Sequence, residues 1–235
     1  MTKHSLSITL FLLLFFCGTL HAQLKLGVEA GPDFSRLLNI LQGFNGNGQP
    51  VSQNSQAVTR FYGGLFLDIP LDKNDQFILQ PSLRYRGAGG ETPQIIDYNG
   101  NRLADKTKYR FNYVDLPVQL LYSPSLSFGK PWIGGGFYSG ILVNASTKAG
   151  SDAAQSLTIG SASNDDVKRF DFGFNATIGL TLKCGVLMGG DFQQSLGNLT
   201  PTSSGSNSAS KVRNTMWGIH VGYTWSLNGK ASPKN

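Results

Sequence analysis

Residues 215–225 read TMWGIHVGYTW, and the pattern of this stretch governs how the rest of the chain is interpreted. Trp217, Ile219, Val221, Tyr223 and Trp225 occupy alternate positions, so they share one face if the stretch is extended. A period of two predicts a β-strand, because successive side chains leave a strand in opposite directions. An apolar face with aromatic residues at both ends is typical of a strand that crosses a bilayer. The stretch therefore predicts a membrane-spanning β-strand.

Similar alternation recurs along the chain, and long connections alternate with short ones. Loops are expected at residues 33–59, 87–108, 144–167 and 195–211. Short turns on one side, long loops on the other and an even strand number are typical of outer-membrane barrels. The sequence thus predicts an all-β protein, an eight-stranded antiparallel transmembrane β-barrel with long extracellular loops and short periplasmic turns. The expected strands cover residues 24–31, 60–69, 77–86, 109–122, 131–143, 169–180, 186–194 and 215–225.

Two of these runs carry a proline, and one is rich in glycine. A central strand does not normally contain proline, so Pro81 and Pro117 predict a bulge or a local break in the ladder. Glycines 134–136 obscure the alternation of the fifth strand and leave its register open. They lack the strand–turn–helix setting and the lysine of a phosphate-binding loop, so close strand packing is expected there.

The first residues of the chain predict export from the cytoplasm. Lys3 and His4 precede an apolar run at residues 6–20, and a small residue, Ala22, follows. This order indicates a signal peptide cut after Ala22. A retained anchor is the alternative, but the apolar run is short for a spanning helix. The expected domains are a signal peptide (1–22), an outer-membrane β-barrel domain (23–225) and a polar periplasmic tail (226–235).

Composition supports a barrel in the outer membrane. The chain has 29 glycines, 14% charged and 40% hydrophobic residues, and after the signal peptide no run reaches the roughly 20 apolar residues of a spanning helix. Only helices and closed barrels satisfy every backbone group in lipid. Cys184 would be the one thiol left after processing, so no internal disulfide is expected. The net charge of +6 comes without a nucleic-acid-binding signature, which favours anionic lipid head groups as partners and excludes nucleic acid.

The charged residues of the predicted strands fall on the face opposite the apolar one. A soluble barrel would turn its apolar face inward and its charges to water, whereas a membrane barrel does the reverse. Aromatic residues at the ends of the apolar face favour the membrane arrangement. The narrow lumen of such a barrel would force charges of opposite sign to pair, with Arg84 and Arg86 at the centre. The predicted lumen charge network consists of Glu29, Asp68, Arg84, Arg86, Asp115, Asp171 and Asp191.

Basic residues recur where the even-numbered strands would enter from the outer side. Cations at that height would meet the phosphates of lipopolysaccharide in the outer leaflet. Ordinary solubilising charge at the bases of the loops is an equally good interpretation. The basic collar consists of Arg60, Lys108, Arg110, Lys168, Arg169, Lys211 and Arg213.

Residues suited to catalysis are few. His220 is the one histidine of the expected mature chain, on the inward face of the last strand. A barrel hydrolase would need a partner for it, and Asp171, Asp191 or Ser139 could lie near. A hydrogen-bonded lumen histidine is the simpler interpretation. No catalytic, cofactor or metal site is predicted, and the protein is expected not to be an enzyme.

Several stretches resemble a known family, the PorT-like outer-membrane β-barrel proteins. The resemblance extends over almost the whole expected mature chain. A last strand with a terminal aromatic is also similar to the signal that barrels present to their insertion machinery. The stretches are LKLGVEAGPDFS (24–35), FYGGLFLDIPLDKNDQFILQPSLRYRGAG (61–89), YVDLPVQLLY (113–122), RFDFGFNATIGL (169–180) and NTMWGIHVGYTW (214–225).

The resemblance implies the fold and a place in the cell outer membrane. The family's namesake takes part in a protein-secretion system, which implies an envelope or secretion protein as partner. We therefore expect a structural or interaction module of the cell envelope, and an accessory role in secretion follows from the resemblance alone. A porin-like channel for small solutes or ions, and a barrel enzyme that uses His220, are the alternatives.

Overall fold

The computed structural model describes residues 24–44, 50–96, 102–201 and 211–227. The expected signal peptide, residues 1–22, lies outside the described residues, as does most of the expected tail. Within the described segments no helix is long and apolar enough to span a membrane.

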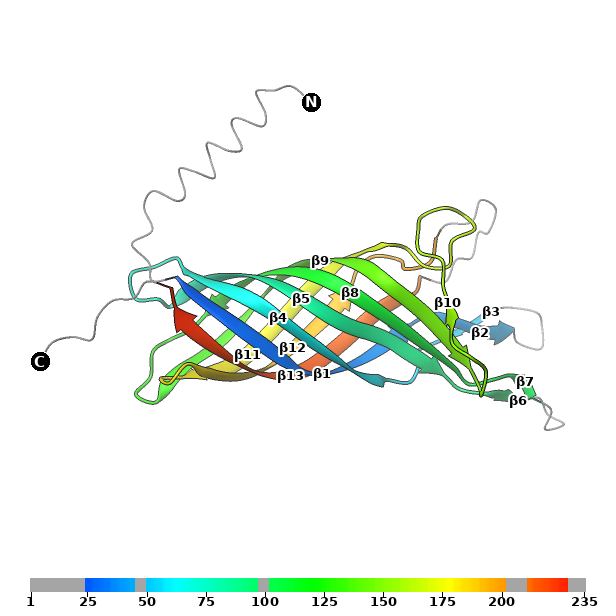
Figure 1. Ribbon diagram of the computed structural model, residues 1–235, viewed down its shortest axis with the longest axis horizontal. Coiled ribbons are helices and arrows are strands. Elements are labelled where there is room, and N and C mark those ends of the chain that lie inside the picture. Colours follow the sequence, from blue (N-terminus) through cyan, green and yellow to red (C-terminus); the bar gives the residue numbers. More distant parts are fainter. Residues whose placement is uncertain (1–23, 45–49, 97–101, 202–210, 228–235) are drawn as a thin grey trace, which may run out of the picture.

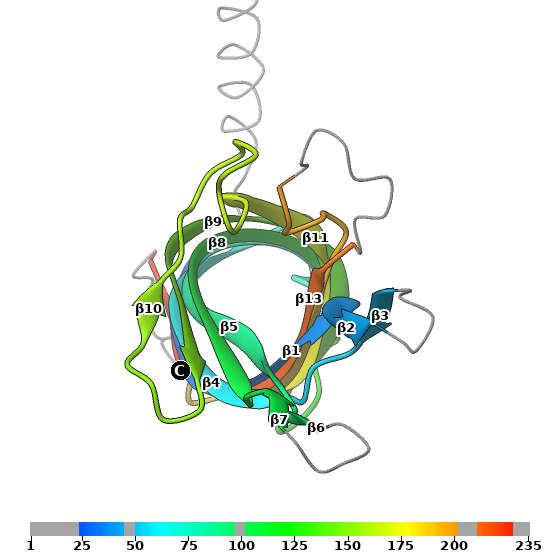
Figure 2. The same cartoon turned by 90° about the vertical axis from the view of Figure 1, so that its right-hand side faces the viewer.

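Eight antiparallel strands close into a barrel, as the sequence predicts (Figure 1). Each strand pairs with the next one in the list below, and the last pairs with the first to complete the ring (Figure 2). The strands are β1 (Lys25–Leu38), β4 (Val58–Pro70), β5 (Phe77–Thr92), β8 (Thr107–Tyr122), β9 (Gly129–Ala149), β11 (Phe170–Leu182), β12 (Val186–Ser195) and β13 (Arg213–Ser226).

The two ends of the barrel differ. Short accessory strands lie at one end, which we call the loop end (Figure 1). The opposite end carries the three tight connections and the first and last described residues, and we call it the turn end. The accessory strands are the hairpin of β2 (Ile40–Phe44) with β3 (Pro50–Gln53), the hairpin of β6 (Ile95–Ile96) with β7 (Arg102–Ala104), and β10 (Gln155–Ser156) beside β9.

The turn between β4 and β5 shows how local chemistry fixes a tight connection. The Asp72 carboxylate accepts hydrogen bonds from the backbone N–H groups of Phe77 (2.7 Å), Asn74 (3.0 Å) and Gln76 (2.7 Å). These bonds lower the pKa of Asp72, and the bond from Phe77 contributes most. Asp75 has a φ of 51°, in the left-handed region that aspartate tolerates better than most residues.

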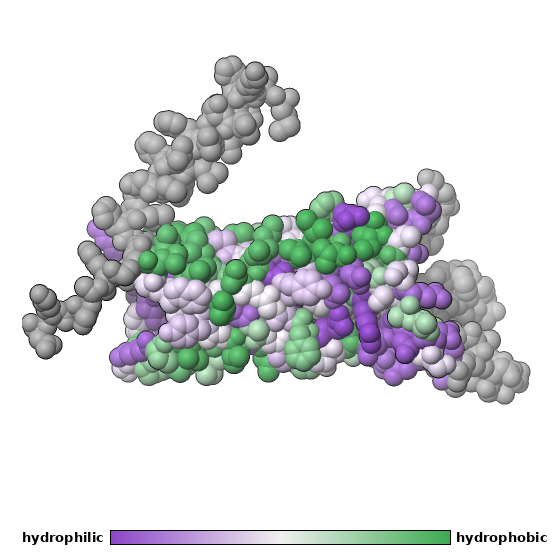
Figure 3. All heavy atoms as spheres, viewed as in Figure 1, coloured by the Kyte–Doolittle hydropathy of each residue, from purple (hydrophilic) through white to green (hydrophobic). Residues whose placement is uncertain are grey.

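The barrel has its apolar side chains outside and its polar side chains inside. Leu83 and Tyr85 of β5 are exposed, whereas Arg84 and Arg86 between them are buried. The same alternation holds on the other strands, so apolar residues cover much of the wall (Figure 3). This arrangement is the reverse of a soluble barrel and suits a wall surrounded by lipid.

Several strands are longer than the sequence analysis predicts. The loops expected to begin at residues 33, 87 and 144 do not begin there, because β1 continues to Leu38, β5 to Thr92 and β9 to Ala149. The prediction relied on an apolar outward face. Beyond the apolar wall both faces of a strand are free to carry polar residues, so the pattern fades before the strand ends.

The expected disturbance at the prolines is an interruption and not a bulge. Beyond Pro81 the pairing of β5 with β8 stops and resumes in the same register at Arg84. Pro117 lies on β8 opposite this interruption. A β-bulge occurs elsewhere. Strand β9 has one extra residue opposite the step from Asn112 to Tyr113 of β8.

The register of the fifth strand, which the sequence leaves open, is fixed in β9. Phe137 is 72% exposed on the outer wall and Tyr138 is 4% exposed in the lumen. The glycines before them allow close strand packing, as expected, because a Cβ at Gly136 would lie 1.9 Å from the carbonyl oxygen of Val118.

We predict that the loop end faces the cell exterior and the turn end faces the periplasm. Cys184, exposed in the turn between β11 and β12, should resist a large polyethylene-glycol maleimide on intact cells and react once the outer membrane is opened. In a Cys184→Ser background, Ser151→Cys at the loop end should react on intact cells. The readout is the mass shift on a gel, and the opposite labelling of the two thiols would reverse the topology.

Candidate functional site in the barrel lumen

The centre of the lumen is filled by ion pairs around Arg86. This residue of β5 is 0% exposed. Its Nη1 lies 2.9 Å from Oδ2 of Asp33 on β1. Its Nε lies 3.4 Å from Oδ2 of Asp115 on β8, and its Nη2 lies 3.5 Å from Oδ2 of Asp191 on β12. One guanidinium therefore ties β5 to three other strands around the ring.

Arg84 makes a second set of ion pairs nearer the turn end. Its Nε lies 2.6 Å from Oε1 of Glu29 on β1, and its Nη1 lies 3.6 Å from Oδ1 of Asp191. Both guanidiniums also lie over the ring of Tyr62, with their Cζ atoms 5.5 Å (Arg84) and 4.6 Å (Arg86) from its centroid. Such cation–π contacts gain strength where water is excluded.

His220 adjoins this network. The Tyr62 hydroxyl lies 2.5 Å from Oδ1 of Asp191 and 2.6 Å from Nδ1 of His220. The imidazole is also 3.7 Å from Asp191 through Nδ1 and 3.8 Å from Glu29 through Nε2. The imidazole thus joins β13 to the side chains of β1, β4 and β12 in this network.

Trp132 covers the turn-end side of His220. Its indole stacks on the imidazole at 5.9 Å with an interplanar angle of 5°, and its Nε1 donates to Oγ1 of Thr181 at 3.1 Å. The ring has room because Gly179 and Gly189 have no side chains. A Cβ at either glycine would lie within 2.4 Å of the indole. Glycines on two strands thus allow an aromatic plug inside the barrel.

The loop-end half of the lumen is packed in two layers. The Asp171 carboxylate accepts hydrogen bonds from Ser195 (2.5 Å), Tyr138 (3.1 Å) and Asn214 (3.4 Å). Beyond this polar layer lies an apolar cluster that includes residues of the connections as well as of the strands. Its buried members include Leu37, Ala88, Phe111, Leu142, Val167, Leu199 and Met216.

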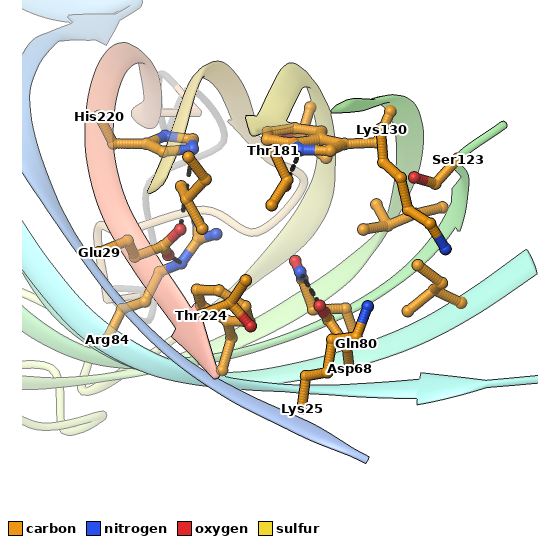
Figure 4. Close-up of a pocket in the computed structure, with 16 residues that line it drawn as sticks. Lys25, Glu29, Asp68, Gln80, Arg84, Ser123, Lys130, Thr181, His220 and Thr224 are labelled. Carbon is orange, nitrogen blue, oxygen red and sulfur yellow. Dashed lines mark hydrogen bonds and ion pairs between the residues drawn. The ribbon is translucent and has the colours of Figure 1, made fainter. Parts of the chain in front are cut away.

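Cavities lie at the two ends of the barrel. At the loop end, a cavity of about 380 Å³ is lined mainly by apolar side chains, among them Ile40 and Phe111. At the turn end, a cavity of about 40 Å³ reaches His220, with Lys25 and Lys130 on its far side (Figure 4). In that cavity Gln80 donates to the Asp68 carboxylate at 2.8 Å.

The structure brings most of the predicted lumen network together. Glu29, Arg84, Arg86, Asp115 and Asp191 share the central ion pairs. The two remaining members lie apart from the arginines, Asp68 with Gln80 near the turn end and Asp171 with neutral donors near the loop end.

Asp33 also belongs to this network, although the sequence places it in the first expected loop. Its position gives a signal that could have found it. Asp33 has the same parity as Glu29 on β1, so continued alternation through Pro32 would have placed it in the lumen.

The basic collar is divided between two sides of the barrel. Arg60 and Arg110 come together near β5, where Arg60 Nη2 donates to Oδ1 of Asn112 at 2.7 Å. Lys108 pairs across the strands with Glu91 and Lys148. The other members lie near β11 and β13, and they are Lys168, Arg169, Lys211 and Arg213.

The partners that a catalytic His220 would need are only partly present. Asp191 lies beside it, but Asp171 bonds to Ser195 and Tyr138 instead. The suggestion that Ser139 lies near His220 is wrong, because Ser139 is exposed on the outward face of β9. Among the described residues, no group of three or more His, Cys, Asp or Glu side chains is placed to hold a metal ion.

We predict that the Arg84–Glu29 pair is strongly coupled. Arg84→Ala leaves a buried carboxylate without its guanidinium and should lower the free energy of unfolding by about 3–5 kcal/mol. Adding Glu29→Gln should restore part of that loss, since the stranded charge is gone. Denaturant unfolding of the detergent-solubilised barrel measures both. Additive effects of the two changes would show that the pair is not coupled.

The solved structures with a similar fold include three that are distant in sequence. Ail of Yersinia pestis is 12% identical, with 87% of this chain and 100% of that chain covered and a TM-score of 0.41. AlkL in lipid bilayers is 15% identical, with 88% and 93% covered and a TM-score of 0.44. OprG of Pseudomonas aeruginosa is 13% identical, with 88% and 98% covered and a TM-score of 0.43. These likenesses concern the fold alone.

Sequence comparison identifies the family. No curated protein matches the chain by sequence. Residues 19–201 match the family model described as the outer membrane protein beta-barrel domain. With its barrel fold, its apolar outer wall and this match over most of its length, the chain belongs to the outer membrane protein beta-barrel domain family.

Proposed function

We propose that the protein is a sealed, non-enzymatic barrel that serves as a structural or interaction module of the cell envelope. The observation that carries this proposal is the complete burial of Arg86 among three carboxylates at the centre of the lumen. The interior of an eight-stranded barrel is just wide enough for its own side chains. A solute could pass only if these ion pairs separated, which would leave charges unpaired in a narrow space.

The environment of His220 weighs against the enzyme alternative. The His220 side chain is 1% exposed; Tyr62 bonds to its Nδ1 and Trp132 stacks on its ring. A base needs hydrogen-bond reach to the proton of a nucleophile or substrate. Here Nδ1 is already engaged by Tyr62, so the imidazole serves better as a member of the lumen network.

The sealed lumen leads to an electrical prediction. Reconstituted in planar bilayers, the protein should show no steady conductance, because the central side chains fill the barrel. Arg86→Ala, which removes the central guanidinium, should give flickering leak currents in the same assay. A stable, ion-selective conductance of the unaltered protein, changed in size by Arg84→Ala, would make the porin-like alternative the better one.

An accessory role in secretion or envelope assembly is the finer part of the proposal. It rests on the resemblance to the PorT-like proteins, and the long connections at the loop end offer the surface for an envelope protein as partner. The folding pathway would also involve the barrel-insertion machinery, as for other barrels with a terminal aromatic strand.

A pulldown after crosslinking in native envelopes tests this role. The tagged protein should recover secretion or envelope-assembly components. Replacing residues 151–165 by a short Gly-Ser linker should reduce that recovery, since it removes an exposed part of the loop end. Inserting the same linker at Asn74, in a turn-end connection, should not. Equal recovery with all three proteins would contradict an interaction through this loop.

A further inference from the structure

The Arg60 side chain starts on the lumen side of β4, but its guanidinium lies on the outer surface of the barrel. Its position has the same parity as Tyr62, whose side chain is in the lumen. However, the described pairing of β4 with β5 ends at Tyr62 and Arg86, so the strands are free to separate beyond that point. Arg60 donates through Nη2 to Asn112, which is on the outward face of β8 together with Val114 and the exposed Leu116. Its guanidinium therefore lies on the outside of the barrel.

A glycine on the intervening strand makes this crossing possible. Gly87 of β5 lies directly opposite Asn112 in the ladder, between the two ends of the Arg60 side chain. A Cβ at Gly87 would lie 2.8 Å from Nε and 3.2 Å from Nη2 of Arg60. Any other residue at this position would have to push the guanidinium aside. The Arg60 side chain thus packs across the outer face of β5 at Gly87.

A second arginine, Arg110, lies on the same outer surface as the Arg60 guanidinium. Arg110 is exposed on the outward face of β8, two residues from Asn112, and is close enough to repel Arg60. Among the residues that the structure describes, no carboxylate forms an ion pair with either arginine. The nearest acid along β5, Glu91, binds Lys106 at 2.7 Å. The Nε of Arg60 is buried and has no hydrogen-bond partner among the described residues.

The position of Arg60 and Arg110 relative to the apolar wall indicates which negative groups balance their charge. Tyr85 of β5, 54% exposed, precedes Gly87 on the same outward face, and its ladder neighbour Val114 is apolar as well. Towards the loop end, Asn112 lies opposite Asn144 and Arg110 opposite Ser146. The arginines therefore lie where the lipid-facing wall gives way to a polar surface, at the height of the lipid head groups.

We propose that Arg60, Asn112 and Arg110 form a binding site for a phosphate group at the head of an outer-leaflet lipid. Two guanidiniums and an amide offer planar, directional donors. Such donors match the geometry of phosphate oxygens better than the ammonium group of a lysine does, since that group acts as a point charge. The lipid chains would then lie along Tyr85 and Val114. The site depends on the same orientation as the proposed function, with the loop end outside, but not on whether the lumen is sealed.

Native mass spectrometry of the mature protein in nonionic detergent tests the site, with diphosphoryl lipid A as the probe. Arg60→Gln with Arg110→Gln should weaken lipid A binding about tenfold or more, the loss expected when charged hydrogen bonds to phosphate are removed. Lys168→Gln with Lys211→Gln removes the same charge from the other side of the barrel and should change binding far less. Gel mobility before and after heating verifies that each variant is folded.

A charge-neutral variant separates geometry from charge. Gly87→Ala keeps every cation, but its Cβ displaces the Arg60 guanidinium, so lipid A should bind less tightly than to the unaltered protein. Inorganic pyrophosphate, as competitor, distinguishes the source of the phosphate. If pyrophosphate displaces lipid A at equal concentration, a soluble phosphate is the ligand and the lipid is excluded. Equal losses in the two double variants, or no loss in Arg60→Gln with Arg110→Gln, would overturn the site.

Discussion

Arg86 is completely buried, and three carboxylates from three other strands surround it. A charge in so narrow a lumen is tolerable only when it is paired, because an unpaired buried charge costs several kcal/mol. The pairing therefore constrains the barrel as a whole. A slip of one residue between neighbouring strands would turn Asp115 or Asp191 towards lipid and an apolar residue inward. The ion pairs thus help to specify the register of β1, β8 and β12 against β5.

The same constraint separates the two surfaces of the barrel. Once the lumen holds the charges, the outer wall is left to apolar residues such as Leu83 and Phe137, and these suit a lipid surrounding. Between the cavities at its two ends, the lumen is packed with side chains that differ by layer: Trp132 and His220 towards the turn end, the arginines at the centre, and the apolar cluster towards the loop end. A packed interior of this kind favours a function at the surface of the barrel over one in its lumen.

Sequence reasoning could find the barrel because its signal is local. A period of two identifies each strand, and Arg84, Glu29 and Asp191 could be placed in the lumen by parity alone. What depends on neighbouring strands could not be found in this way. The stacking of Trp132 on His220 needs glycines on two other strands, and the exit of Arg60 depends on where β4 stops pairing with β5. The strands β1, β5 and β9 extend beyond their expected ends because the outward apolar pattern stops before the strands do.

The basic residues show why parity on a strand is not enough to locate a side chain. By alternation Arg60 belongs to the lumen, where the carboxylates already outnumber the guanidiniums and a third arginine would find partners. Its guanidinium lies outside instead, on the same surface as Arg110, and no carboxylate of the described residues forms an ion pair with it. Electrostatics within the chain alone would favour the opposite placement. Negative charge from outside the chain would stabilise this arrangement, and at the edge of the apolar wall the lipid head groups are the nearest source.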